Sequence, residues 1–303
     1  MRTLVTGGAG FIGSHVVDAL LEAGHEVAVV DNLHTGKRAN LNPKATFYEM
    51  DICDREGLAR VFKLARPEVI CHQAALADVR GAFLEPVAYA EVNIIGSINL
   101  LELARQYTVR KVVYASTGGA VYGEPVYLPV DEAHPVNPLD PYGASKHAVE
   151  HYLFLYKHNY GLDWVTLRYP NVYGPRQDTM GEAGVVAIFS GRMLAGQPCT
   201  INGDGLQQRD FVYVSDIARA NVLALEHGSG IYNIGSGIPT DVNTVFDLLK
   251  TASGYQQEAL RGPAKPGEVR RTYLDATRAR SELGWTPTIA VADGLQRTVD
   301  SFK

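Results

Sequence analysis

The sequence predicts an α/β fold in which a doubly wound parallel sheet is joined to a smaller α/β part. Short apolar runs alternate with helical segments over residues 1–170, which is the pattern of repeated strand–helix–strand units. A glycine-rich stretch lies directly between the first apolar run and the first helical segment. In parallel α/β proteins a turn of that kind marks the ligand-binding edge of the sheet.

The chain of 303 residues is long enough for about two domains. After Pro170 the regular alternation gives way to shorter runs and more turns. We therefore expect a first domain of residues 1–170 with a returning segment at about 211–235. The second domain is expected to comprise residues 171–210 and 236–303.

Each element of the first domain has its own signal of apolar periodicity. The expected strands are Arg2–Thr6, Glu26–Val30, Thr46–Met50, Glu68–His72, Arg110–Ala115 and Asp163–Leu167. The expected helices are Ser14–Ala23, Arg55–Ala65, Pro86–Gln106 and a segment from Tyr142 to His158.

The second half is expected to contain helices at 181–195, 216–226, 240–251 and 290–301. Turns are expected at Tyr173–Arg176 and at Asn202–Gly205. A strand is expected at Gln208–Val214, with Ser215 capping the helix that follows it. Ile231–Ile234 is expected to be a further strand of the main sheet.

Composition excludes several classes of protein. The net charge of −5 argues against bulk nucleic-acid binding, and we expect no transmembrane segment and no signal peptide. Three scattered cysteines, Cys53, Cys71 and Cys199, form neither a metal-binding spacing nor a disulfide framework. We therefore expect a cytoplasmic protein with no metal site.

The glycine-rich stretch predicts a dinucleotide site. Gly7, Gly10 and Gly13 are spaced Gly-x-x-Gly-x-x-Gly between a strand and a helix. Glycines let the backbone approach a pyrophosphate, and the helix N-terminus supplies free N–H donors to it. A purely structural turn is the alternative, and the strand–loop–helix context makes it the weaker one.

Asp31 follows the second expected strand, roughly 20 residues after the glycines, where an acid suits the ribose hydroxyls of NAD. An acid there would repel the 2′-phosphate of NADP, although Lys37 and Arg38 lie nearby and leave NADP open. Farther along, Ala74 and Ala75 are small enough for a ligand to lie against the backbone. Asn93, set between apolar residues, would be buried and is expected to brace the strand ends.

Tyr142 and Lys146 form a candidate proton-transfer pair. A spacing of four residues places both side chains on one face of a helix. A free tyrosine has a pKa of about 10, and a nearby ammonium lowers the pKa of the phenol. By itself the pattern is weak, since an ordinary amphipathic helix carries such a pair by chance. Ser116 and Thr117 offer hydroxyls at a strand end, where they point to a ligand or cap a turn.

Taken together, the features resemble the extended short-chain dehydrogenases/reductases, within the NAD-dependent epimerase/dehydratase group. The resemblance covers essentially the whole chain. Its marks are Gly7-x-x-Gly10-x-x-Gly13, Asp31, Asp51-Ile52, Ala74-Ala75, Asn93, Val121-Tyr122-Gly123, Tyr142-x-x-x-Lys146, Arg168-Tyr169-x-Asn171, Arg209 to Asp216, Pro266-Gly267-Glu268 and Glu282 to Trp285.

The resemblance implies a Rossmann-type domain that holds NAD tightly, a UDP-sugar bound between two domains, and a homodimer. The pattern is most similar to the epimerases that act on UDP-glucose and UDP-galactose, which are isomerases of galactose metabolism. That implies inversion of C4 through a transient 4-keto sugar. Tyr142 would take the proton of the 4-OH and later return it, while the C4 hydrogen is transferred to NAD and back.

The resemblance also implies roles for residues by their position in the motifs. Cofactor contacts are implied for Phe11, Ile12, Asp31, Asn32, Asp51, Ile52, Ala74, Ala75, Asn93, Tyr142, Lys146, Tyr169 and Pro170. Substrate contacts are implied for Thr117, Tyr142, Asn171, Cys199, Ile201, Arg209 and Glu268.

Two positions depart from the pattern of the group. Epimerases carry a Ser or Thr that bonds the sugar O4 where this chain has Gly118. Either Thr117 reaches O4 from one residue away, the reading that the flexible glycines favour, or Tyr142 works without a hydroxyl partner. Some epimerases also carry a Lys near the diphosphate where this chain has Ala77, and Arg80 is the candidate to compensate.

Other functions stay open on the sequence. UDP-N-acetylglucosamine and UDP-glucuronate are alternative substrates, and the base is either uridine or thymidine. A 4,6-dehydratase would need an acid pair after Thr117, where this chain has Gly118 and Gly119. A decarboxylase needs a dedicated cation for the sugar carboxylate, and none stands out. A non-catalytic NAD-binding relative would be expected to lose Tyr142 or Lys146.

Overall fold

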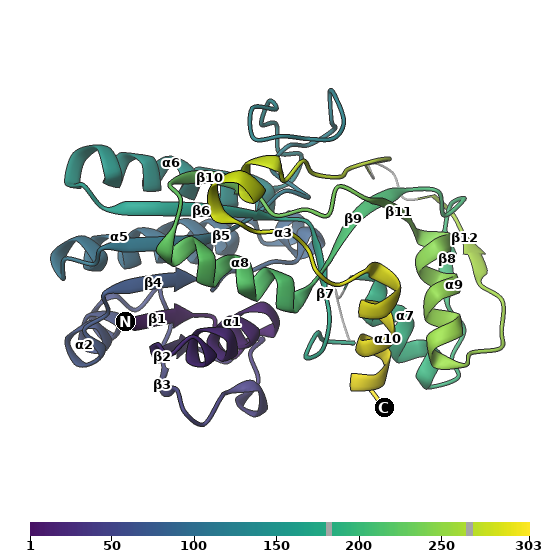
Figure 1. The fold of residues 1–303 in the computed structure, drawn as a ribbon, viewed down its shortest axis with the longest axis horizontal. Helices are drawn as coiled ribbons and strands as arrows, with labels where there is room; N and C mark the ends of the chain where they lie inside the picture. Colours follow the sequence, from purple (N-terminus) through teal and green to yellow (C-terminus); the bar gives the residue numbers. More distant parts are fainter. Residues whose placement is uncertain (180–183, 265–268) are drawn as a thin grey trace.

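A computed structural model describes residues 1–179, 184–264 and 269–303, and its centre is a seven-stranded sheet. All neighbouring strands of this sheet run parallel, in the order β10-β6-β5-β4-β1-β2-β3 (Figure 1). The strands are β1 (Arg2–Thr6), β2 (Glu26–Asp31), β3 (Thr46–Glu49), β4 (Val69–His72), β5 (Lys111–Thr117), β6 (Asp163–Tyr169) and β10 (Gly230–Asn233). The strand order reverses between β1 and β4, where parallel sheets bind ligands at their carboxyl edge.

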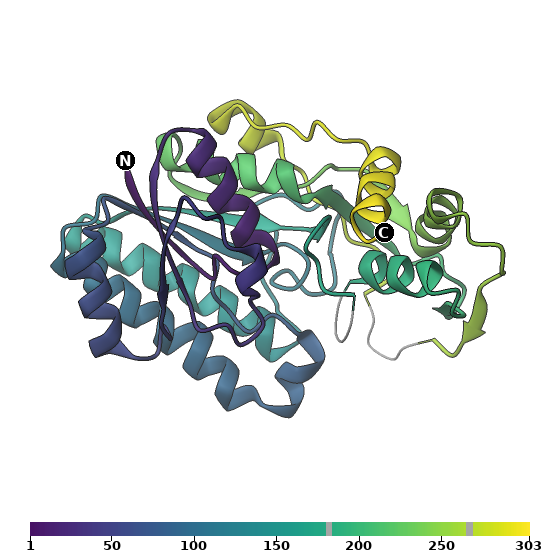
Figure 2. The same cartoon turned by 90° about the horizontal axis from the view of Figure 1, so that it is seen from below.

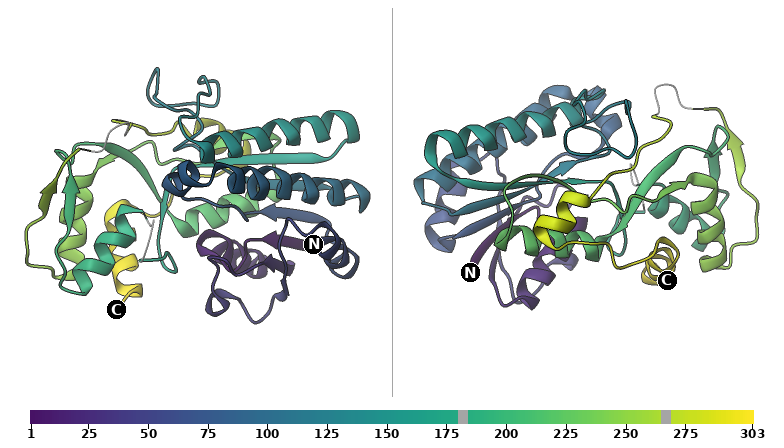
Figure 3. Two further views of the ribbon diagram at one scale, coloured as in Figure 1. Left: turned by 180° about the vertical axis from the view of Figure 1, so that it is seen from behind. Right: turned by 45° about the horizontal axis from the view of Figure 1, so that its top comes forward.

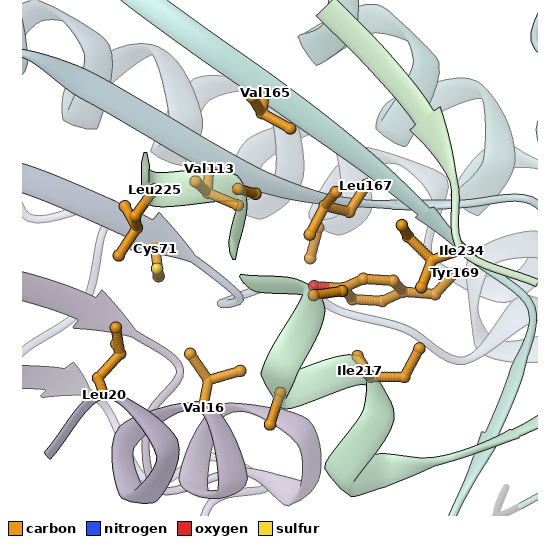
Figure 4. Packing of buried hydrophobic residues seen from close by; sticks show 14 of the residues in the cluster. Val16, Leu20, Cys71, Val113, Val165, Leu167, Tyr169, Ile217, Leu225 and Ile234 are labelled. Atoms are coloured by element: carbon orange, nitrogen blue, oxygen red, sulfur yellow. The ribbon is translucent and has the colours of Figure 1, made fainter. Parts of the chain in front are cut away.

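Helices cover both faces of this sheet, as the doubly wound prediction requires. On one face lie α1 (Phe11–Glu22) and α8 (Val214–Glu226), which pack against each other. On the other face lie α2 (Arg55–Ala65), α5 (Ser97–Gln106) and α6 (Pro141–Tyr160) (Figure 2). Figure 4 shows the core under α1 and α8, where Val16 and Leu20 meet residues of β5, β6 and α8. Removal of this apolar surface from water holds the layers together.

The predicted helix Pro86–Gln106 is continuous but not uniform. It begins as α4 (Pro86–Tyr89), widens into the π-helical turns of η2 (Ala90–Gly96) and ends as α5. By length and composition alone this segment is long and apolar enough to cross a membrane, a match that the sequence analysis did not anticipate. The segment packs against α6 and α2, as a core helix of this fold does. Since a core helix meets the same criteria of length and composition, the match is only weak evidence for a membrane span.

The smaller part of the molecule lies beyond the carboxyl ends of the main strands (Figure 1, Figure 3). One small sheet has the order β11-β9-β7, and the other pairs β12 with β8. The strands are β7 (Asn171–Tyr173), β8 (Thr200–Asn202), β9 (Gln208–Tyr213), β11 (Pro239–Asp241) and β12 (Leu260–Gly262). Helices α7 (Val185–Leu194), α9 (Val242–Ser253) and α10 (Val291–Ser301) pack with one another around them.

Short elements complete the described chain, namely η1 (Arg38–Asn40), α3 (Val79–Leu84) and η3 (Ala279–Leu283). Three local predictions are wrong. Ser215 does not cap α8, which begins one residue earlier with Tyr213 at its N-cap position and no side-chain cap. Tyr173 ends strand β7 instead of starting a turn. Thr240 lies in β11, and Asp241 caps α9 by accepting a hydrogen bond from the Thr244 N–H at 2.8 Å.

Candidate functional site

The glycine loop between β1 and α1 is too tight for side chains. A Cβ on Gly13 would lie 2.0 Å from the Gly7 carbonyl oxygen, and Gly7 itself has φ +70° with Ala74 N 2.7 Å from its Cβ position. Helix α1 begins at Phe11, and its N-cap residue Gly10 offers no side-chain acceptor. The first N–H groups of α1 are therefore free to bind an anion such as a pyrophosphate.

A cavity of about 520 Å³ runs from this loop along the carboxyl edge of the sheet. Of the residues predicted to bind the cofactor, all but two line it. The residues that line it are Gly7, Gly10, Phe11, Ile12, Gly13, Asp31, Asn32, Asp51, Ile52, Ala74, Ala75, Tyr142, Lys146 and Tyr169. Asn93 and Pro170 are absent from the lining. Ser116, one of the two strand-end hydroxyls that the sequence offered, is present, and so is Gln73, which no motif pointed to.

The acidic end of this cavity is fixed by hydrogen bonds. Asp31 accepts the Ala9 N–H at 2.9 Å and the Leu33 N–H at 2.8 Å. Asp51 accepts the Asn32 amide at 2.8 Å and the Cys53 N–H. Burial opposes ionisation of Asp51, but these hydrogen bonds outweigh it and hold its pKa below the usual value. Two carboxylates held this way suit ribose hydroxyls and repel a 2′-phosphate.

The nearby cations that left NADP open on the sequence are paired elsewhere. Lys37 lies 3.6 Å from the Asp178 carboxylate, and Arg38 forms an ion pair with Glu49. Both pairs are exposed and therefore weak, yet they turn the cations toward carboxylates outside the cavity lining. This arrangement favours NAD.

Tyr142 lies in the first turn of α6, whose N-cap residue Asp140 accepts the Gly143 N–H at 2.7 Å. Burial raises the pKa of Tyr142 to about 12, a hydrogen bond with Thr117 lowers it in part, and the charge of Asp140 raises it. The expectation that Lys146 lowers this pKa is not met in the chain by itself. Burial is the largest cause of the rise, and Lys146 is not among its causes.

Lys146 is 3% exposed and lines the cavity one turn after Tyr142. Burial lowers its pKa to about 7, and the charge of Glu150 opposes this shift. Its Nζ lies 4.6 Å from the centroid of the Tyr114 ring, and within the described residues it has no hydrogen bond or ion pair. Lys146 therefore lines the cavity with donor capacity that a ligand hydroxyl could use.

The missing hydroxyl at Gly118 has a steric explanation. A Cβ at this position would lie 2.5 Å from Leu274 Cδ1, and Leu274 is buried. The Gly118 N–H donates to the Tyr169 carbonyl at 2.7 Å, so the strand pairing of β5 with β6 continues to this residue without a shift. Thr117, the last residue of β5, is then the hydroxyl that bonds Tyr142. This contact favours the first of the two readings of the sequence.

Asn93 has the bracing contacts expected of a buried amide. Its Oδ1 accepts the Leu76 N–H at 2.8 Å, and its Nδ2 donates to the Leu76 carbonyl and to Ser145 Oγ. Ser145 Oγ in turn donates to the Tyr142 carbonyl at 2.8 Å. Asn93 thus ties the loop after β4 to the first turn of α6. The π-helical turns of η2, which contain Asn93, are a common feature of functional sites.

Two further hydrogen-bonded groups support the site. His72 bonds Thr6 Oγ1 at 2.7 Å and Ser97 Oγ at 2.8 Å, and burial lowers its pKa to about 3, so it is a neutral structural residue. Tyr169 accepts a hydrogen bond from Asn221 of α8 at 2.7 Å. No sequence motif indicated Asn221, because only the packing of α8 against β6 brings it close to Tyr169.

A second cavity, of about 390 Å³, lies in the smaller part of the molecule. The predicted substrate residues Asn171, Ile201 and Arg209 line it, as does Arg80, the candidate to replace a lysine at Ala77. Its lining also contains Arg192, which the sequence reading missed. Three guanidinium groups in one cavity suit a phosphate-bearing ligand.

Two predicted substrate residues do not line this cavity. Cys199 is fully buried in the core of the smaller part, and its carbonyl accepts the Leu260 N–H at 2.8 Å. The side chain and carbonyl of Cys199 are therefore occupied, and the prediction that it lies against the ligand is not supported. Glu268 lies outside the described residues.

Comparison with known proteins defines the family. Residues 3–235 match the model of the NAD-dependent epimerase/dehydratase family, so the chain belongs to that family. It is 46% identical to the UDP-glucose 4-epimerase of Mycolicibacterium smegmatis over 100% of this chain and 99% of the relative.

Two solved structures are similar along their whole length. The UDP-glucose 4-epimerase of Thermotoga maritima, solved with UDP-glucose, is 51% identical with a TM-score of 0.98 over 100% of this chain and 98% of that one. The UDP-glucose 4-epimerase of Thermus thermophilus, solved with NAD, is 49% identical with a TM-score of 0.95 over 100% of this chain and 99% of that one.

Proposed function

We propose that the chain is an NAD-dependent epimerase that inverts C4 of a UDP-hexose through a transient 4-keto sugar, with UDP-glucose and UDP-galactose as the pair. One observation carries the proposal. Tyr142 is held at the edge of the dinucleotide cavity, hydrogen-bonded to Thr117 and one turn from Lys146, whose ammonium has no acceptor among the described residues. The identity of 46–51% to named UDP-glucose 4-epimerases supports the choice of sugar.

The first cavity fits NAD, which when bound supplies a reversible acceptor for the C4 hydrogen and its electron pair. The glycine loop and the N-terminus of α1 would hold the pyrophosphate. Asp31 and Asn32 would hold the adenosine ribose, and Asp51 and Ile52 would flank the adenine. Lys146 would donate to the second ribose, beside Ala74, Ala75, Tyr169 and Pro170, with Asn93 as a positioning residue.

Tyr142 is proposed to move the proton of the sugar 4-OH. It accepts this proton as phenolate and returns it after the sugar has turned over. In the chain by itself the pKa of Tyr142 is about 12, so catalysis requires that a positive charge in the closed site stabilises the phenolate. Thr117 assists by hydrogen bonding, which also lowers the pKa of Tyr142.

The second cavity is proposed to bind the nucleotide diphosphate. Asn171, Arg80, Arg192 and Arg209 would neutralise it, and the strand around Ile201 would face the uridine. In this proposal residues 1–170 and 211–235 carry the cofactor, while 171–210 and 236–303, including Cys199 and Glu268, form the nucleotide-sugar domain. The diphosphate then anchors the molecule while the sugar rotates.

We also propose that the enzyme is a cytoplasmic homodimer. All three cysteines are free, which suits a reducing compartment. Exposed apolar side chains gather on neighbouring elements α3, α4, η2 and α6, an arrangement typical of an interface. They are Phe83, Leu84, Val87, Ile95 and Leu155. Light scattering is expected to give twice the mass of one chain, and the mass of one chain would overturn the dimer.

The decisive experiment is a turnover panel with UDP-glucose, UDP-N-acetylglucosamine and UDP-glucuronate, read by separation of the products. We expect UDP-galactose from UDP-glucose, with slower or no turnover of the other two. Turnover of UDP-glucuronate alone would overturn the choice of sugar. No product from any nucleotide sugar would overturn the enzyme itself and favour a binding protein.

A further inference from the structure

Two histidines lie side by side on the outward side of α6, away from the two cavities described above. His147 and His151 are four residues apart, and their rings meet at 4.6 Å between centroids. The Nε2 atoms are 3.1 Å apart. In the single chain His151 is exposed and the side chain of His147 is 27% exposed, so both nitrogens are within reach of solvent ions. Leu155 of the proposed dimer interface lies one turn beyond His151 on α6, so a dimer would carry this site beside the interface.

The distance between the nitrogens is suitable for chelation of one metal ion. With metal–nitrogen distances of about 2.0–2.1 Å, a separation of 3.1 Å corresponds to an angle of about 95–102° at the metal. This angle lies between the octahedral and tetrahedral values. Both ligands come from a single rigid helix, so metal binding costs little conformational entropy.

The protein also orients one of the two ligands. His147 Nδ1 lies 3.0 Å from Glu150 Oε2, and Glu150 is itself held by Arg168 at 2.6 Å and by Ser116 at 2.7 Å. With Nδ1–H donating to this fixed carboxylate, Nε2 of His147 carries a lone pair, which in the metal-free chain accepts a hydrogen bond from His151 Nε2 and which a metal ion would take over. A carboxylate behind a ligating histidine is the usual supporting arrangement at metal sites.

We propose that His147 and His151 form a chelating site for one divalent transition-metal ion of the zinc, nickel or copper class, oriented by Glu150. Imidazole ligands select these ions over magnesium and calcium. Water fills the remaining coordination positions, since the described residues contain no cluster of three or more such ligands. The proposal departs from the prediction, based on cysteine spacing, that the chain has no metal site.

The test is a zinc titration of chelator-stripped full-length protein, followed by calorimetry and by the thermal unfolding midpoint. The parent is a Cys53→Ser variant, because Cys53 is an exposed free thiol that would bind zinc independently. His151→Gln and His147→Gln remove one ligand each. His158→Gln is the matched control, because His158 lies farther along α6 and stacks on Phe154.

We expect one zinc ion per chain in the parent and in His158→Gln, with at least tenfold weaker binding in each ligand variant. Zinc is expected to raise the unfolding midpoint of the parent but not of His151→Gln, since only the native state holds both ligands together. Since His151 is exposed, this variant is expected to fold normally. Parental zinc affinity in both ligand variants, or no binding by the parent, would overturn the site.

Discussion

The two cavities of the molecule are built in different ways. The dinucleotide cavity is formed by backbone: a glycine loop without room for a Cβ, a helix N-terminus and two carboxylates held by N–H and amide groups. The second cavity is formed by side chains, with arginines from α3, α7 and β9. The first cavity collects residues that mostly follow the strands of one parallel sheet, and the second collects side chains from elements that share no common sheet. Mutations in the two cavities should therefore have different kinetic effects.

The largest effect is expected from Tyr142→Phe, which removes the proton-transferring oxygen and keeps the ring. Turnover of UDP-glucose should fall by about 10²–10⁴-fold, the usual contribution of a general acid–base. Product separation measures the rate, and circular dichroism confirms the fold. Near-normal turnover would refute Tyr142 as the base and with it the proposed function.

Thr117→Val should lower kcat by about 10-fold or more and leave KM nearly unchanged, because in the proposed mechanism Thr117 acts on the reacting oxygen. The Thr117 hydrogen bond lowers the pKa of Tyr142, so its loss raises that pKa. In this variant the pH at which kcat begins to rise should therefore be higher than in the parent.

The matched control for this change is Thr166→Val on β6, a buried threonine whose Oγ1 has no partner among the described residues. Thr166→Val should give the same dependence of kcat on pH as the parent. A Thr117→Val profile that coincides with this control would mean that Tyr142 works without a hydroxyl partner.

A change in the second cavity should affect binding more than chemistry. Arg192→Ala is expected to raise KM for UDP-glucose by about 10-fold with little change in kcat, since in the proposed function it contacts the anchored diphosphate of the substrate. Arg261→Ala is the control, because Arg261 is exposed and bonds Asn243 outside the cavity lining. Initial-rate kinetics give both constants. A fall in kcat alone would break the distinction between the two cavities.

The smallest effect concerns stability and pH. The folded chain lowers the pKa of Lys146 to about 7, below the value of about 10.4 for an exposed lysine. Between these values the unfolded chain binds more protons, so this residue makes stability rise with pH. Lys146→Met should remove that part of the slope and stabilise the ligand-free protein near pH 7. Urea unfolding at pH 7 and pH 9.5 measures the free energy of unfolding of both proteins. The same change with pH in the parent and in Lys146→Met would contradict a lowered pKa of the buried lysine.

Most residues that the sequence predicted to bind the cofactor line the first cavity, because the motifs that carry them lie at strand ends. The glycines, Asp31 and Tyr142 each lie next to a strand end, and parallel strands bring their carboxyl ends to one edge. Fewer of the predicted substrate residues line the second cavity, which contains Arg192 and does not contain Cys199. The reason is that neither a helix face nor a strand face could be assigned before the small sheets were known.

By itself, the sequence determined the class of fold, the dinucleotide loop and the pair Tyr142 and Lys146, because these depend on short-range patterns of residues. The tertiary structure revealed that Leu274 lies where a side chain at position 118 would be, 2.5 Å from a Cβ there to Leu274 Cδ1. It also decided the charge state around Tyr142, because desolvation of Lys146 depends on how β5 and α6 pack. Burial is a property of the whole fold, and no spacing of residues along a chain can specify it.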